Sequence, residues 1–366
     1  MAARKSNVEL LEKLWDWVKE LQLTPEEISN RVWLSKNKHG RTAWHVAARK
    51  SNVEMLEKLW DWAKNLLLKP DELRNNVCFS KDNAGETAWH MAAKLGHIEV
   101  LEKLWDWAKE LKLKPEEFRN VVWISKNNSD ETAWHMAAKE GHIEILGKLW
   151  DWAKKMQLKP EELRNEVCFS KDNGGETAWH MAAELGYTEI LEKLWDCAKE
   201  LKLTPEELRN EVWLSKNKHG RTAWHVAARK SNVDVLEKLW DWAKEMQLKP
   251  EELRNEVCFS KDNGGETAWH MAAELGHIEI LEKLWDCAKE LQLTPEELRN
   301  EVLLSKNKHG QTAWYVVTRK CNIEVLEKLS EWAKELQLEP EMLRREDVFV
   351  ERQVRRYGMA YGRKKR

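Results

Sequence analysis

The feature that most constrains this chain is a tryptophan that returns every 45 residues. All eight prolines fall on the same 45-residue spacing, so no proline is left to mark a linker between domains. A fixed period of this length is typical of tandem repeat proteins. We predict one array over residues 1–343, with a partial first repeat and then seven repeats of 45 residues. The recurring tryptophans are Trp44, Trp89, Trp134, Trp179, Trp224, Trp269 and Trp314.

Each repeat carries the signals of three short helices and no strand. In TAWHMAAEL, Thr267 is a suitable N-cap. Gly276, which follows the segment, is suited to the left-handed conformation that ends a helix. The next segment, IEILEKLWDCAKEL, places apolar residues at three- and four-residue steps, which indicates one buried helical face. A third helix begins at T-P-E-E, residues 294–297, with a Thr cap and Pro in its first turn. The polar S-K-x-x-x-G stretch that follows predicts a finger between repeats.

The segment G-E-T-A-W-H-M-A-A-E-L-G-H-I-E-I-L resembles the ankyrin repeat, whose pattern is G-x-T-P-L-H-x-A followed by a Gly-His or Gly-Asn turn. Ala stands here for the family's Pro and Trp for its Leu. The repeat is also about twelve residues longer than usual, and the excess lies in L-x-P-E-E-L-R-N-E-V. We therefore predict an all-α, ankyrin-like solenoid with an extra short helix per repeat. A generic helical solenoid of the armadillo or tetratricopeptide type is the alternative, and the T-A-W-H turn disfavours it.

Two histidines seven positions apart, His270 and His277, raise the question of a metal or acid/base site. Zinc would need a third and a fourth ligand, and no cysteine lies at a plausible short spacing. The second histidine is also replaced, by Tyr187 in one repeat and by Asn in three others, so a ligand pair cannot be general. We predict no metal and no cofactor.

The resemblance to ankyrin repeats implies a structural role for the first histidine. In that family it bonds to the Thr hydroxyl and to the backbone of a neighbouring repeat. The residues assigned to this tie are Thr42, His45, Thr87, His90, Thr132, His135, Thr177, His180, Thr222, His225, Thr267 and His270.

No other motif favours catalysis, and we predict that the chain is not an enzyme. The paired carboxylates Glu296 and Glu297 lie in a solvated first helical turn, whereas a general acid needs burial. Gly174 and Gly175 lack the Lys-Ser/Thr that follows a phosphate-binding loop. The cysteines stand in slots that other repeats fill with Trp or Leu, which indicates reduced packing residues.

The second helices repeat two further tryptophans in L-W-D-W. Trp105 belongs to the apolar face of its helix and Trp107 flanks it, so we expect their rings to cover the seam between neighbouring repeats. The last repeat has Ser330 in the first of these positions, as expected where no further repeat stacks.

Binding specificity in such an array must come from positions that vary, and the fingers vary in charge. One set of repeats has basic fingers, with Lys38, His39, Arg41, Lys218, His219 and Arg221. The repeats between them have acidic fingers, with Asp82, Glu86, Asp172, Glu176, Asp262 and Glu266. In proteins that this chain resembles, fingers and first helices line a concave partner-binding face. We expect either a charge-striped surface that reads a protein partner, or stripes that neutralise each other between adjacent fingers.

Charge and hydropathy limit where the protein can be located and which kinds of partner it can bind. The 61 basic and 63 acidic side chains nearly cancel, and no long apolar run indicates a membrane span or signal peptide, so we expect a monomer in the cytoplasm or nucleus. Residues 344–366 have nine Lys/Arg and three Asp/Glu, which predicts a disordered basic tail. The function we predict is a protein-interaction scaffold. A nuclear regulator whose tail contacts nucleic acid, and the targeting fragment of a larger enzyme or channel, remain open.

Overall fold

Helices account for every regular element in the part of the chain that the computed structural model describes, residues 8–21, 24–28, 34–65, 73–75 and 79–338. The predicted all-α repeat fold is therefore confirmed there. The predicted basic tail at 344–366 lies outside the described residues. None of the described helices combines the length and apolarity needed to cross a bilayer.

The chain forms two compact parts, one of residues 1–181 with 192–202 and one of residues 182–191 with 203–366. The first part contains α2 (Val8–Glu20), α3 (Pro25–Ile28), α4 (Ala43–Arg49), α5 (Val53–Asn65), α7 (Ala88–Leu95), α8 (Ile98–Glu110), α9 (Pro115–Val122), α10 (Ala133–Lys139), α11 (Ile143–Lys155), α12 (Pro160–Glu162) and η3 (Leu163–Cys168). Helices α13 (Ala178–Leu185) and α14 (Thr188–Glu200) each have residues in both parts.

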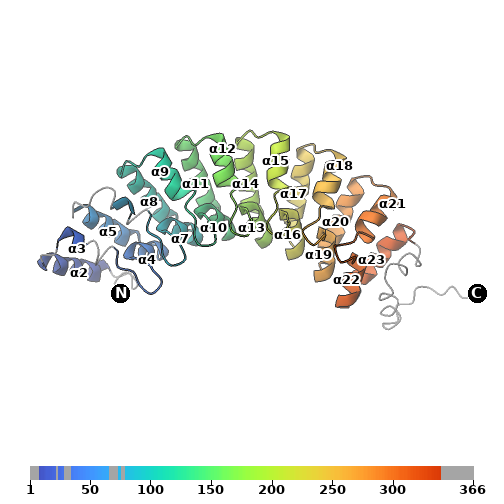
Figure 1. Ribbon diagram of the computed structural model, residues 1–366, viewed down its shortest axis with the longest axis horizontal. Helices are drawn as coiled ribbons and strands as arrows, with labels where there is room; N and C mark the ends of the chain where they lie inside the picture. Colours follow the sequence, from blue (N-terminus) through green and yellow to red (C-terminus); the bar gives the residue numbers. More distant parts are fainter. Residues whose placement is uncertain (1–7, 22–23, 29–33, 66–72, 76–78, 339–366) are drawn as a thin grey trace, which may run out of the picture. The chain divides into compact units, whose positions relative to one another are not determined.

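The second part repeats the same order of helices. It contains α15 (Pro205–Val212), α16 (Ala223–Lys230), α17 (Val233–Glu245), α18 (Pro250–Glu252), η4 (Leu253–Cys258), α19 (Ala268–Leu275), α20 (Ile278–Glu290), α21 (Pro295–Leu298), η5 (Arg299–Leu303), α22 (Ala313–Lys320) and α23 (Ile323–Glu335). In each part the first helices of the repeats follow one edge and the third helices the other, with the second helices between them (Figure 1).

The first helix of each repeat is short because its ends are fixed by sequence. Thr267 is the extended N-cap of α19, and Gly276 ends that helix at φ 80°, as predicted. The two alanines in the middle of the helix, Ala272 and Ala273, are fully buried. Because alanine is small, neighbouring first helices such as α16, α19 and α22 pack directly against each other.

The second helices bury an aromatic face that joins consecutive repeats. Trp107 stacks on Trp60 of the preceding repeat, with ring centroids 5.0 Å apart, and Trp152 stacks on Trp105 at 4.6 Å. The prediction that these rings cover the seam between repeats is confirmed. Ser330 of the last repeat is half-buried, and its hydroxyl donates to the Leu326 carbonyl at 2.7 Å.

The extra third helix is present in the predicted segment, but its geometry differs between repeats. Where Trp123 and Trp213 follow it, α9 and α15 are regular α-helices, and each indole N–H donates to a second-helix carbonyl at 3.2 Å. Where Cys168 and Cys258 stand instead, the helix ends in the wider π-helical turns η3 and η4. A π-helical turn also precedes Leu303, as η5, so these turns occur where a residue other than Trp closes the third helix. Nothing in the sequence pattern alone indicated a π turn.

The five cysteines in the described part of the chain form no disulfide, and four of them are buried. Burial, together with the neighbouring Cys197 thiol, raises the pKa of Cys168, and burial raises the pKa of Cys197 to about 12. These thiols are therefore unreactive packing groups at neutral pH. Cys321 is exposed, and Cys78 lies outside the described residues.

Candidate functional site

Each finger is a tight turn closed by its own first side chain. In the first described finger, residues 37–41, the Asn37 amide oxygen accepts the backbone N–H groups of His39 and Arg41 at 2.8 and 3.1 Å. Asp82 does the same in the next finger, accepting from Ala84 and Glu86 at 2.8 and 3.0 Å. One oxygen of the candidate residue Asp82 is therefore already engaged in stabilising its own turn.

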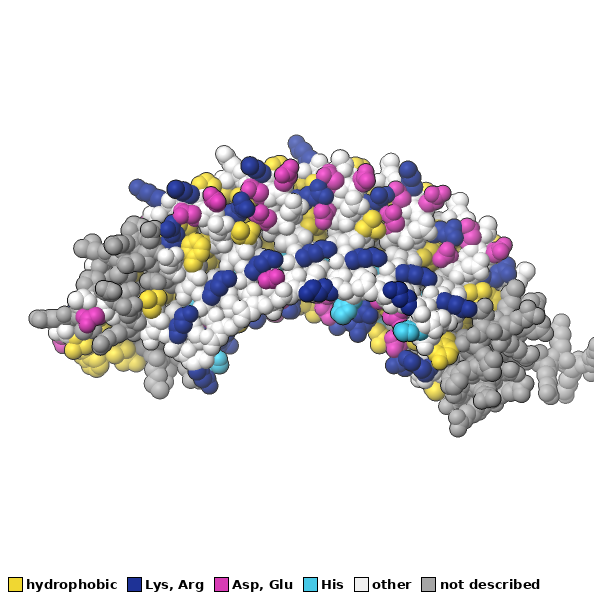
Figure 2. Space-filling model, in the orientation of Figure 1, with side chains coloured by type: hydrophobic (Ala, Val, Ile, Leu, Met, Phe, Trp, Pro, Cys, Tyr) yellow, Lys and Arg dark blue, Asp and Glu magenta, His cyan; other side chains and the backbone are white. Residues whose placement is uncertain are grey.

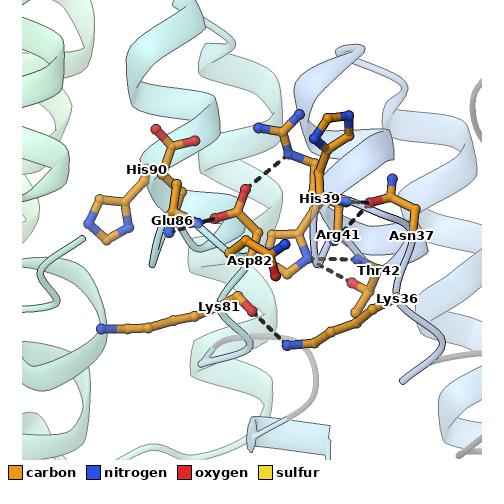
Figure 3. Close-up of polar contacts among 12 residues, drawn as sticks. Lys36, Asn37, His39, Arg41, Thr42, Lys81, Asp82, Glu86 and His90 are labelled. Carbon is orange, nitrogen blue, oxygen red and sulfur yellow. Dashed lines mark hydrogen bonds and ion pairs between the residues drawn. The ribbon is translucent and has the colours of Figure 1, made fainter. Parts of the chain in front are cut away.

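Neighbouring fingers are joined by an ion pair between the basic and the acidic kind. The Arg41 Nε donates to the second Asp82 oxygen at 3.0 Å (Figure 3). Arg221 donates to Asp262 in the same way, at 3.2 Å. The Asp82 side chain is only 1 % exposed and the Arg41 side chain 20 %. These charges thus neutralise each other between fingers and are largely withdrawn from solvent.

The candidate glutamates stand beside the first helices. Glu86 is buried and pairs with Lys94 at 3.2 Å. In the repeat of Glu266 that lysine is replaced by Glu274, and burial, with Asp262 and Glu274 nearby, raises the pKa of Glu266. Asp172 and Glu176 are half-buried, and the Glu176 backbone N–H donates to Asp172 at 2.8 Å.

The exposed members of the candidate set are the fingertips. Lys38, His39, Lys218 and His219 are all exposed. Their backbone is nevertheless fixed, because the His39 and Lys38 carbonyls accept from the backbone and side-chain amides of Asn83 at 3.0 and 3.3 Å. The tips therefore present cationic and imidazole groups on a rigid support.

The threonine and histidine of T-A-W-H form a buried cap that also reaches the next repeat. In His90, Nδ1 lies 2.8 Å from the Thr87 hydroxyl and accepts the Thr87 backbone N–H at 3.2 Å. Since Nδ1 accepts, Nε2 carries the proton and donates to the Ser125 carbonyl at 3.0 Å. Burial lowers the pKa of His90 and of His225 to about 4. Both imidazoles are therefore neutral at pH 7.

The same geometry recurs along each part. Nε2 of the first histidine lies 2.8–3.0 Å from the following repeat's serine carbonyl at His45, His135, His225 and His270. The threonine hydroxyl of the motif lies 2.8–3.0 Å from Nδ1 of the histidine three residues later. This holds at Thr42, Thr132, Thr177, Thr222 and Thr267. The T-A-W-H histidine thus has the geometry of a tie between repeats.

The second histidine has a role that the sequence reasoning missed. Each of these histidines contacts the preceding repeat: Nε2 lies 3.1–3.2 Å from a backbone carbonyl near the end of that repeat's first helix. The residues are His97, His142 and His277. Asn232 replaces it with its amide, which donates to the Ala183 carbonyl at 2.7 Å. The sequence signal for this contact was that the position holds either His or Asn in most repeats, because both side chains can donate a hydrogen bond.

The described ranges hold no group of three or more His, Cys, Asp or Glu side chains arranged for a metal ion. What the helices and fingers do define is a class: a stacked helical repeat module that presents turns and first helices as a surface. The family model for ankyrin repeats in three copies matches residues 1–115 and 196–296, which is more than half of the chain. The chain belongs to the ankyrin-repeat family. No curated protein matches it.

Proposed function

We propose that the chain is a non-enzymatic scaffold that binds a protein partner through its fingertips and the C-terminal turns of its first helices. Ankyrin repeats generally mediate protein–protein interaction and are typically non-enzymatic modules. Repeat architecture supplies a surface and leaves the ligand open, so the face and the partner are our inference.

The observation that carries the proposal is the contrast between buried and exposed charge in the fingers. Asp82 and Asp262 are occupied by their own turns and by the preceding arginine, so we assign them to holding the fingers. Lys38 and Lys218 remain exposed at the tips of the basic fingers. The surface offered to a partner is therefore basic at the fingers of residues 37–41 and 217–221, and we expect the partner to be acidic there.

Exposed leucines supply apolar contacts on the same helices. Leu95 and Leu275, the last residues of α7 and α19, are 40 % and 48 % exposed, and Leu185 of α13 is 46 % exposed. They occupy the slot that other repeats fill with Lys50 or Lys230. A partner segment that places apolar side chains at alternate repeats, and acidic side chains against the two basic fingers, fits this pattern.

A charge-reversal capture experiment tests the proposal. We expect the full chain to retain a protein from cell extract, and Lys38→Glu with Lys218→Glu to reduce its capture at least about tenfold, because like charges oppose the partner. The matched control is Lys109→Glu with Lys199→Glu. These are two exposed second-helix lysines, and within the described ranges each forms an ion pair only with an aspartate three residues earlier. Equal capture by the fingertip variant and the unmodified chain would refute the face we assign.

The two other functions predicted from the sequence have separate tests. If the basic segment 344–366 contacts nucleic acid, binding to an oligonucleotide will fall steeply with salt and disappear when that segment is removed. If the chain is a targeting fragment, a longer transcript will carry an enzyme or channel domain in the same frame.

A further inference from the structure

A row of lysines runs beside the fingers and is separate from the fingertips. It consists of Lys36, Lys81 and Lys126 in the first part, and Lys261 holds the same position in the second. We call these residues the lysine row. In Figure 3, Lys36 and Lys81 lie on the opposite side of the Thr42 cap from His39 and Arg41.

Each ammonium in the row is held by the backbone of the next repeat. Lys36 Nζ donates to the Lys81 carbonyl at 2.8 Å, and Lys81 donates to the Lys126 carbonyl at 2.7 Å. Lys126 donates to the Lys171 carbonyl at 3.3 Å, and in the second part Lys261 donates to the Lys306 carbonyl at 3.0 Å. An ammonium has three N–H donors, so this contact fixes its position and leaves others for a ligand. The row is thus preorganised, although its side chains are long.

The charge of the row is not neutralised as it is elsewhere. Several second-helix lysines, Lys58, Lys103 and Lys148 among them, pair with a glutamate of the preceding repeat, as Lys58 does with Glu12 at 2.7 Å. Among the described residues no carboxylate lies within ion-pair distance of Lys36, Lys81 or Lys261. Lys126 has only Asp130, at 4.0 Å.

The row is therefore a line of positive charge on an otherwise balanced surface. In each part, Figure 2 shows Lys and Arg side chains following one another across the viewed face, with acidic side chains concentrated elsewhere. A line of like charges raises the local concentration of an anionic ligand.

We propose that the lysine row binds an extended acidic peptide segment in which Asp or Glu recurs at every third residue. The helices of neighbouring repeats pack about 8–10 Å apart, so the ammonium groups recur at about that distance. A polyproline II segment advances about 3.1 Å per residue, which brings every third side chain back to one side after about 9.3 Å. A β-strand repeats its side after about 6.7 Å and does not match.

The surroundings favour a peptide over a nucleic acid. Single-strand binding sites combine a basic groove with aromatic side chains on which bases stack. The exposed large apolar side chains of the described residues include one aromatic, Trp17. It belongs to α2, on a second helix, and not to the segments that carry the lysine row. The row thus supplies charge at intervals without a stacking platform.

The proposal is tested by fluorescence anisotropy with the full chain and two labelled peptides of about twelve residues. One has Glu at every third position with Pro between, and the other has the same composition with its glutamates consecutive. We expect the spaced peptide to bind more tightly. Lys81→Gln with Lys126→Gln should weaken it about fivefold, as expected for two exposed ion pairs, and binding should fall with salt.

Matched variants separate the row from general charge. Lys109→Gln with Lys199→Gln removes the same charge elsewhere and should leave the affinity unchanged. Lys81→Arg with Lys126→Arg keeps the charge and should retain binding, and far-UV circular dichroism checks that every variant is folded.

Three results would overturn the proposal. These are equal weakening by the row and control variants, equal binding of the spaced and clustered peptides, and tighter row-dependent binding of a single-stranded oligonucleotide. The Lys38→Glu with Lys218→Glu variant serves as a further control, because it tests the fingertip face and should still bind the spaced peptide.

Discussion

Acidification should destabilise this array through its buried histidines. The pKa of His90 and of His225 is about 4 in the folded chain, against an ordinary value of 6.5. Between these values the unfolded chain binds protons that the folded chain does not. Stability is therefore fully retained above pH 6.5 and is lost progressively as the pH falls from 6.5 to 4.

The magnitude follows from the two pKa values. At pH 5 each of these histidines favours the unfolded state by about 2 kcal/mol, and below pH 4 by about 3.4 kcal/mol. His90 and His225 together should lower the free energy of unfolding by about 4 kcal/mol between pH 7 and pH 5. Burial also lowers the pKa of His45, His135 and His270, which act in the same direction. Glu266, whose pKa is raised, acts in the opposite direction.

The assay is urea unfolding followed by far-UV circular dichroism at pH 7 and pH 5. His90→Phe with His225→Phe should be less stable at pH 7, because the Ser125 and Ser260 carbonyls lose a donor. The same variant should lose about 4 kcal/mol less on acidification than the unmodified chain. If both proteins lose the same free energy, the buried histidines are not the cause and the reasoning fails.

Two further predictions concern the seams between repeats. Trp152→Ala should lower the free energy of unfolding by about 3–5 kcal/mol, because the buried indole stacks on Trp105, whereas Trp17→Ala, at an exposed site, should change it by less than about 0.5 kcal/mol. Similar urea midpoints for these two variants would contradict the stacking argument. Gly220→Ala should lower the free energy of unfolding more than Gly310→Ala. Both glycines have positive φ, 75° and 72°, but a Cβ at Gly220 would lie 2.6 Å from the Asn263 backbone nitrogen, whereas a Cβ at Gly310 would meet no described atom within 4 Å. Equal unfolding midpoints would show that backbone conformation alone sets the cost.

Local signals in the sequence predicted most of the fold. Thr267 and Gly276 marked the ends of α19, and Thr294 with Pro295 marked the start of α21, because caps and helix starts depend on neighbouring residues. The recurrence of these signals every 45 residues predicted the stacking of repeats.

The candidate site was predicted less completely. The alternation of basic and acidic fingers is visible in the sequence, but the chain order does not show that Arg41 reaches Asp82 at 3.0 Å. Residues of the site therefore divide into buried supports, such as Asp82, and exposed tips, such as Lys38, only once neighbouring fingers are placed side by side.

The sequence by itself determined the period and the three helices of each repeat, because helix caps, helix starts and buried helical faces depend on residues a few positions apart. Only the tertiary structure decided which charged side chains pair with a neighbouring repeat and which face solvent. Asp82 and Lys81 are adjacent in sequence, yet one side chain is buried in a finger pair and the other extends along the lysine row. The physical reason is that burial and pairing depend on the neighbouring repeat, whose position only the stacking of repeats fixes.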